Sequence, residues 1–82
     1  MHDTYLNQNI YDAILDLCRK HTIKKVDKLV ITVHTDSHVS EKSLHDFFND
    51  KHSRIVGDWT KITVLRKQIE KLTAVIENIS GE

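Results

Sequence analysis

The sequence predicts an α+β fold in which two helices pack on one face of a small sheet. Apolar residues recur at helical spacing over residues 4 to 21, and a run rich in β-branched residues follows over residues 26 to 33. The first pattern is typical of an amphipathic helix and the second of a strand. The chain has 82 residues, no proline and only two glycines. A chain of this length and composition is expected to form one domain, residues 1 to 82.

The composition excludes several classes of function. Twelve Lys and Arg residues balance twelve Asp and Glu residues, whereas a nucleic-acid-binding domain normally carries a basic surface. No stretch approaches the ~20 apolar residues of a spanning helix, and the first residues lack the layout of a secretory signal. The single cysteine, Cys18, excludes an intramolecular disulfide and a cysteine-based zinc site. We therefore expect a cytoplasmic protein that binds neither nucleic acid nor membranes.

The first helix is predicted over residues 4 to 21. Its apolar residues follow the i, i+3/i+4 spacing of one helical face: Leu6, Ile10, Ala13, Ile14, Leu17 and Cys18. Arg19, Lys20 and His21 fall in the last turn, where positive charge suits the helix dipole.

A strand and a second helix come next. Leu29, Ile31 and Val33 alternate onto one face of a strand predicted over residues 26 to 33. The polar residues 34 to 38 predict a loop. Ser40 can cap a second helix, because its hydroxyl oxygen can accept a hydrogen bond from a free amide of the first turn. That helix is expected to end near His52, and a second strand is predicted over residues 59 to 65.

Two structures are open for the C-terminal segment, residues 66 to 79. Alternating three- and four-residue steps form a heptad seam, which favours a helix, over Ile62, Leu65, Ile69, Leu72, Ile76 and Ile79. Gly81 would then stop the helix. Two such helices can pair in a homodimer, although in so small a chain the seam more readily packs on its own core. The stretch from residue 72 to residue 79 is also β-branched enough for a strand, but residues 67 to 71 contain none of the usual hairpin turn residues.

Several motifs together resemble a known family. The chain opens Met1-His2-Asp3, and the spacing Ser37-x-Val39-x-x-x-x-Leu44-x-x-x-Phe48 follows the first predicted strand. The segments Ile55-Val56-Gly57 and Ile62-Thr63-Val64 come later in the same order. Over about residues 1 to 65 this pattern resembles the hydrogenase nickel-incorporation family (HypA/HybF). The chain departs from the family at Asp3, where members have Glu, and at His34, where they have Gly.

The resemblance implies the nickel-binding half of that family alone. Members insert a zinc-binding domain with two Cys-x-x-Cys pairs after the second strand, and this chain has none. No structural zinc is therefore expected. Residues 72 to 79 would replace the family's final strand, so the resemblance favours a strand where periodicity favours a helix. The predicted order is then helix, strand, helix, strand and strand, with a three-stranded sheet.

The N-terminus is the candidate metal site. The Met1 amine and the backbone amide and imidazole nitrogens of His2 can form adjoining chelate rings, and the amide of Asp3 or an outside ligand can complete the coordination. Square-planar nitrogen donors suit Ni(II) and Cu(II). The resemblance implies the same use of these residues, with Met1 and His2 as nickel ligands and Asp3 in support. It also implies a metallochaperone that serves the maturation of hydrogenase or a related metalloenzyme. A metalloenzyme or maturation factor is then the expected protein partner.

A second-position histidine also occurs by chance, since short motifs have many false positives. The alternative is a small non-enzymatic interaction module that kept the fold without binding metal. If it is a homodimer, its mass in solution would show it. A weaker metal candidate is the polar cluster of His34, Asp36, His38, His45 and Asp46. Its spacing matches no recognised ligand pattern, and solvated loop histidines are the commoner outcome.

The sequence predicts no enzyme. It contains no glycine-rich phosphate loop, nucleophile elbow or HExxH motif. Cys18 lies beside the apolar face of the first helix, where a small buried hydrophobe is the expected role.

Overall fold

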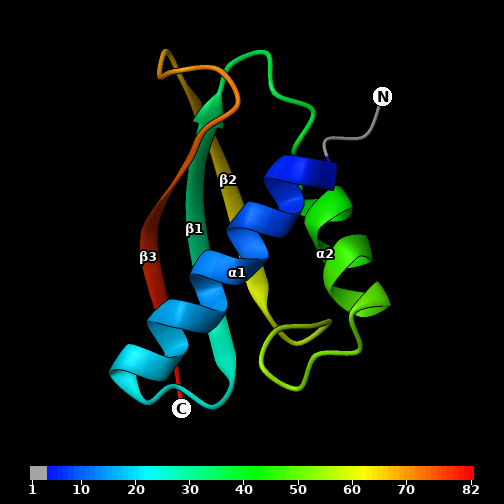
Figure 1. Ribbon diagram of the computed structural model, residues 1–82, viewed down its shortest axis with the longest axis vertical. Coiled ribbons are helices and arrows are strands. Elements are labelled where there is room, and N and C mark those ends of the chain that lie inside the picture. The colour runs from blue at the N-terminus through cyan, green and yellow to red at the C-terminus, as the bar shows by residue number, and fades with distance from the viewer. Residues whose placement is uncertain (1–3) are drawn as a thin grey trace.

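The computed structural model describes residues 4 to 82 and confirms the α+β fold. Its elements follow the predicted order helix, strand, helix, strand, strand: α1 (Thr4–His21), β1 (Val26–His34), α2 (Glu41–Asp50), β2 (Lys61–Lys67) and β3 (Ala74–Gly81). The molecule measures 32 × 23 × 18 Å. In Figure 1, α1 crosses in front of the sheet and α2 lies beside it.

The strand β1 is the centre of the sheet, and the strand order is β2-β1-β3. β1 pairs with β2 in parallel, with α2 in the connection between them. It pairs with β3 in antiparallel orientation. β2 and β3 therefore form the two edges and do not make a hairpin with each other. The connection of residues 68 to 73 carries the chain past the C-terminal end of β1 (Figure 1).

The buried face of α1 is narrower than the sequence predicts. Leu6, Ile10, Ile14 and Cys18 are at most 3% exposed and form one i, i+4 line. Ala13 is exposed, which corrects its placement on the apolar face. The helix ends where Thr22 adopts a left-handed backbone, with φ 56°, and the Ile23 amide donates to the Cys18 carbonyl at 2.8 Å.

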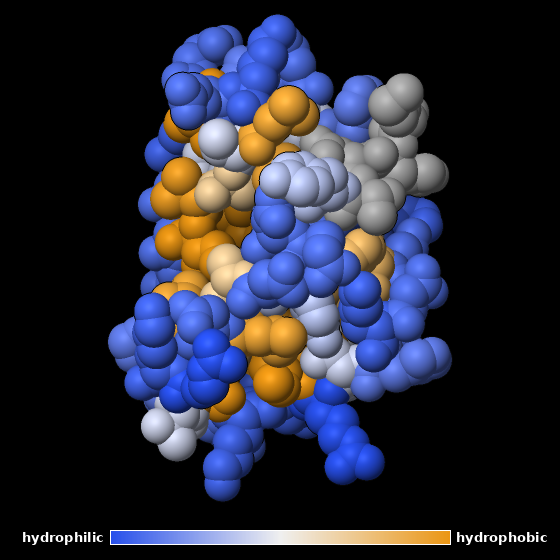
Figure 2. All heavy atoms as spheres, viewed as in Figure 1, coloured by the Kyte–Doolittle hydropathy of each residue, from blue (hydrophilic) through white to orange (hydrophobic). Residues whose placement is uncertain are grey.

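The core lies between the helices and one face of the sheet. Leu29, Ile31 and Val33 alternate along β1 and are fully buried against this core, as predicted. α2 adds Leu44 and Phe48. Figure 2 shows the outer side of α1 as mostly hydrophilic, with hydrophobic atoms visible beside it where β3 lies. A single apolar cluster thus joins both helices to all three strands.

Four elements have other ends than predicted. β1 includes His34, which the sequence predicts in the loop, and β3 spans Ala74–Gly81 rather than residues 72 to 79. β2 begins at Lys61 rather than at Trp59, because the Thr60 amide donates to the Gly57 carbonyl at 3.0 Å and closes a turn. The buried Thr60 hydroxyl also donates to the Val26 carbonyl at 2.8 Å. α2 ends at Asp50 rather than near His52, whose φ of 53° is left-handed.

The helical alternative for residues 66 to 79 is wrong. Residues 74 to 81 form β3, and the sheet partner of Ile79 is Leu29. Two members of the heptad seam are exposed, Leu65 at 38% and Leu72 at 71%. Gly81 does not stop a helix. A Cβ atom there would overlap the Lys25 carbonyl oxygen, so this glycine permits a close approach of β3 to the start of β1.

Candidate functional site: a pocket at the end of the central strand

The predicted nickel ligands Met1, His2 and Asp3 lie outside the described residues. The first described turn of α1, at Thr4, lies at the end of the molecule where β1 ends (Figure 1). The described chain has a pocket at this same end.

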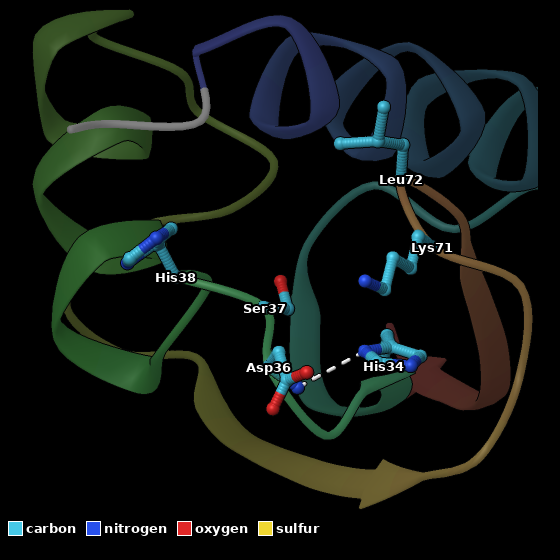
Figure 3. Close-up of a pocket in the computed structure, with 6 residues that line it drawn as sticks. All are labelled: His34, Asp36, Ser37, His38, Lys71 and Leu72. Atoms are coloured by element: carbon cyan, nitrogen blue, oxygen red, sulfur yellow. Dashed lines mark hydrogen bonds between the residues drawn. The ribbon is translucent and has the colours of Figure 1, made fainter.

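The pocket forms where β1 ends and the β2–β3 connection passes over it. Its volume is about 200 Å³, several times the roughly 30 Å³ that one water occupies in the liquid. Six residues line it: His34, Asp36, Ser37, His38, Lys71 and Leu72. Figure 3 shows Lys71 extending from the connection toward Ser37 and His34. Two segments more than thirty residues apart in the sequence therefore make one site.

The loop after β1 is fixed by β2. The Arg66 guanidinium donates to the Ser37 carbonyl at 2.8 Å and to the Val39 carbonyl at 2.6 Å. The Thr35 amide donates to the Lys67 carbonyl at 3.2 Å. Because two residues of β2 satisfy three backbone groups of this loop, the pocket wall has a defined position before any ligand binds.

The start of α2 holds the other end of the loop. Ser40 and Ser43 form a capping box, in which each side chain accepts a hydrogen bond from the other's backbone amide. This confirms Ser40 as the helix cap. The Glu41 carboxylate accepts a hydrogen bond from the Val64 amide at 2.9 Å, which ties the first turn of α2 to β2.

His34 is the buried polar side chain of the pocket. It is 8% exposed, and its Nδ1 atom accepts a hydrogen bond from the Asp36 amide at 3.0 Å. An imidazole nitrogen that accepts a hydrogen bond carries no proton, so the neutral ring holds its proton on Nε2. His34 therefore presents a donor at Nε2.

The connection contributes a cation and a strained backbone. Among residues 4 to 82, the ion pairs join Asp16 to Arg19 and Lys20, and Lys42 to Asp46. Lys71 has no carboxylate partner there. Leu72 has a φ of 61°, which is an outlier for a bulky side chain. Strained backbone of this kind is concentrated at functional sites.

The structure does not assemble the histidine and aspartate cluster as a metal site. No group of three or more His, Cys, Asp or Glu side chains among residues 4 to 82 is placed to hold a metal ion. The His45 Nε2 atom is hydrogen-bonded to the Thr60 carbonyl at 2.8 Å. Asp46 pairs with Lys42 at 2.9 Å. Figure 3 shows the His38 ring apart from His34, on the far side of Ser37.

Cys18 has the structural role expected of it. It is a free cysteine, 2% exposed, and it belongs to the apolar core. Burial raises the pKa of the Cys18 thiol, because the charged thiolate is disfavoured away from water. The thiol is therefore protonated near neutral pH and weakly nucleophilic.

The sequence analysis missed Lys71 and Leu72 as site residues. Lys71 belongs to no motif, Leu72 belongs only to the heptad seam, and both lie in a segment whose structure the sequence left open. They reach the pocket only because β3 pairs with β1 instead of with β2, which sends the connection over the end of β1. The polarity of residues 34 to 38 did identify the other wall, although as a candidate metal cluster.

A scan of the chain against protein-family models finds no match, and searches of curated proteins and of solved structures find no significant match. The resemblance to the nickel-incorporation family therefore stays a prediction. Among the residues that the structure describes, no helix has the length and apolar character needed to cross a membrane.

Proposed function

We propose that this chain is a HypA-like nickel-binding domain that serves the maturation of a hydrogenase or related metalloenzyme. One observation carries the proposal. Periodicity and the family resemblance make opposite predictions for the C-terminal segment, and β3 is the strand that the resemblance requires. A resemblance that rests on residues 1 to 65 thereby predicts a feature of residues 74 to 81, which supports a shared fold.

The β2–β3 connection also agrees with this proposal. Family members carry their zinc domain after the second strand, and here six residues, 68 to 73, join β2 directly to β3. The connection contains no cysteine or histidine. A nickel-binding half without the inserted zinc domain is therefore the form of the proposal that fits this chain.

The proposed ligands are the Met1 amine and the His2 amide and imidazole nitrogens, with Asp3 in support. Such a set holds Ni(II) in square-planar geometry in a chain that starts at Met1 with a free amine. The proposed recipient is a cytoplasmic metalloenzyme or a maturation factor that presents the metal to it.

The test is a titration of Ni(II) into untagged protein, followed by d–d absorption and by the His2 ring signals in NMR. We expect one-to-one binding with a diamagnetic, square-planar spectrum that is lost in His2→Ala. Binding is also expected to weaken as pH falls, because the amine, amide and imidazole must lose protons to bind the metal. The matched control is His21→Ala, which removes an exposed imidazole from the last turn of α1.

Three results would contradict the proposal. The first is a spectrum that survives in His2→Ala, and the second is equal binding by a chain whose amine is blocked by added residues. A folded protein that binds no Ni(II) at micromolar concentrations would also overturn it.

A second candidate function is a non-enzymatic interaction module, and the uncovered face of the sheet favours it. Leu65 and Val75 are 38% and 47% exposed, and both are paired in register with Thr32 of β1. Leu65 and Val75 therefore lie on either side of Thr32, on the face of the sheet that neither helix covers. An absence of nickel binding combined with a dimeric mass in solution would favour this candidate over the metallochaperone.

A further inference from the structure

We propose that the pocket at the end of β1 binds a small carboxylate anion with a short apolar tail. The proposal concerns His34, Ser37, Lys71 and Leu72. It does not depend on nickel, because none of these residues belongs to the proposed metal site. It extends the chemistry of the chain to a second, separate ligand.

The first argument is the donor that His34 presents to the pocket. Nδ1 is occupied by the Asp36 amide, which directs the proton of the neutral ring to Nε2. The side chain is nine-tenths buried and lines the pocket, and the described residues provide no hydrogen-bond partner for Nε2. Because this donor opens on the pocket and has no protein partner there, the ring is suited to a ligand oxygen or a water inside the pocket.

The second argument is the charge of the pocket. The Lys71 ammonium extends toward Ser37 and His34 without an ion-pair partner in the described chain (Figure 3). The Ser37 oxygen accepts the Val39 amide at 3.2 Å, and its own proton is available for a second hydrogen bond. Three donors thus surround one space. Asp36 is exposed on the same lining, so a monoanion is favoured over a doubly charged phosphate.

The third argument is Leu72. Its side chain is 71% exposed at the pocket although it is apolar, and its backbone is left-handed. A glycine or asparagine would adopt this backbone with less strain. An exposed leucine at a strained position gives the pocket an apolar wall. A ligand with a hydrocarbon tail would bind more tightly because its tail removes this wall from water.

The location and rigidity of the pocket agree with ligand binding. It lies beyond the carboxyl end of β1, which is paired in parallel with β2, and crevices of this kind bind ligands in open sheets. The hydrogen bonds from Arg66 hold the loop in place. A preformed site loses less conformational entropy on binding.

The test is a titration of sodium butyrate into the metal-free 82-residue protein in the presence of a chelator, followed by NMR. We expect saturable shifts of the His34 ring signals and of the Lys71 and Leu72 amides, with a dissociation constant in the millimolar range or below. Acetate is expected to bind more weakly than butyrate because it lacks the tail that Leu72 would cover. Inorganic phosphate is expected to bind more weakly than butyrate because of its second charge.

Substitutions in the connection separate binding from folding. Lys71→Gln is expected to weaken butyrate binding at least tenfold, whereas Lys28→Gln removes an exposed charge at the opposite end of β1 and should not. Leu72→Gly is expected to abolish the preference for butyrate over acetate while leaving the melting temperature equal or higher, since it relieves the left-handed strain.

Three outcomes would overturn the proposal. They are unsaturable or absent shifts at His34, equal losses in Lys71→Gln and Lys28→Gln, and tighter binding of phosphate than of butyrate. None of them bears on nickel binding, which the His2→Ala titration tests separately.

Discussion

At the scale of single residues, burial determines which titratable groups are chemically active. Cys18 and His34 are both buried, but their surroundings differ. Cys18 lies in the apolar core, where nothing compensates a charge. His34 lies at a pocket, and one of its nitrogens already has a backbone partner. The thiol is therefore structural, and the imidazole is the better candidate for ligand contact.

The Cys18 thiol predicts a pH dependence of stability. Its ordinary pKa is 9.0, and burial raises the pKa in the folded chain. Above pH 9.0 the unfolded thiol ionises while the folded thiol stays protonated, so the free energy of unfolding falls as pH rises. The loss due to this group is at most about 1.4 kcal/mol per pH unit. Below pH 9.0 its contribution is constant. Urea unfolding at a series of pH values measures the slope.

The control for this prediction is Cys18→Ala, which removes the ionisable group but leaves the other titrating side chains unchanged. This variant is less stable at neutral pH because a buried atom is lost. Its stability should nevertheless decline less steeply above pH 9.0 than that of the unchanged chain. Parallel curves for the two proteins would contradict the argument.

At the scale of elements, the close contact between the ends of β1 and β3 explains Gly81. The Glu82 amide donates to the Lys25 carbonyl at 3.0 Å, and Gly81 pairs with Val26. An added Cβ at Gly81 would overlap the Lys25 carbonyl oxygen and approach the Val26 Cα atom to 2.9 Å. Backbone atoms cannot move aside as a flexible side chain can.

Gly81→Ala is therefore expected to lower the free energy of unfolding by about 1–3 kcal/mol, the usual range for overpacking. Ser80→Ala is the matched control, since Ser80 is the exposed neighbour on the same strand. Chemical denaturation of both variants measures the difference. Equal stability of the two would mean that the strand ends separate without cost, and the explanation of this glycine would be wrong.

The elements differ in how far local sequence predicts them. The first helix follows from an uninterrupted i, i+4 line, and β1 follows from its alternating apolar residues. For residues 66 to 79 the same apolar residues satisfy both a heptad and a strand pattern. Only pairing with β1, a contact distant in sequence, decides between them. For the same reason, local sequence could not predict one wall of the pocket. Lys71 and Leu72 belong to the connection whose path depends on this pairing.

At the scale of the whole molecule, a single core makes each part depend on the others. The apolar cluster includes residues of both helices and all three strands, and β1 contacts both edge strands along most of its length. A chain of this size buries only about 60% of the surface of its unfolded state. It has little stability to lose, so we expect cooperative unfolding without a separately stable half.

Truncation after Gln68 tests this dependence. The shortened chain would lack β3, and β1 would lose the hydrogen bonds of its whole antiparallel edge. Ala74, Ile76 and Ile79, which pack against the core, would be lost with it. We therefore expect the truncated chain to show neither native chemical-shift dispersion nor a cooperative thermal transition, although α1 and α2 remain in its sequence. The full chain under the same conditions is the control. A cooperative transition in the truncated chain would show that the fold requires neither β3 nor the connection that lines the pocket.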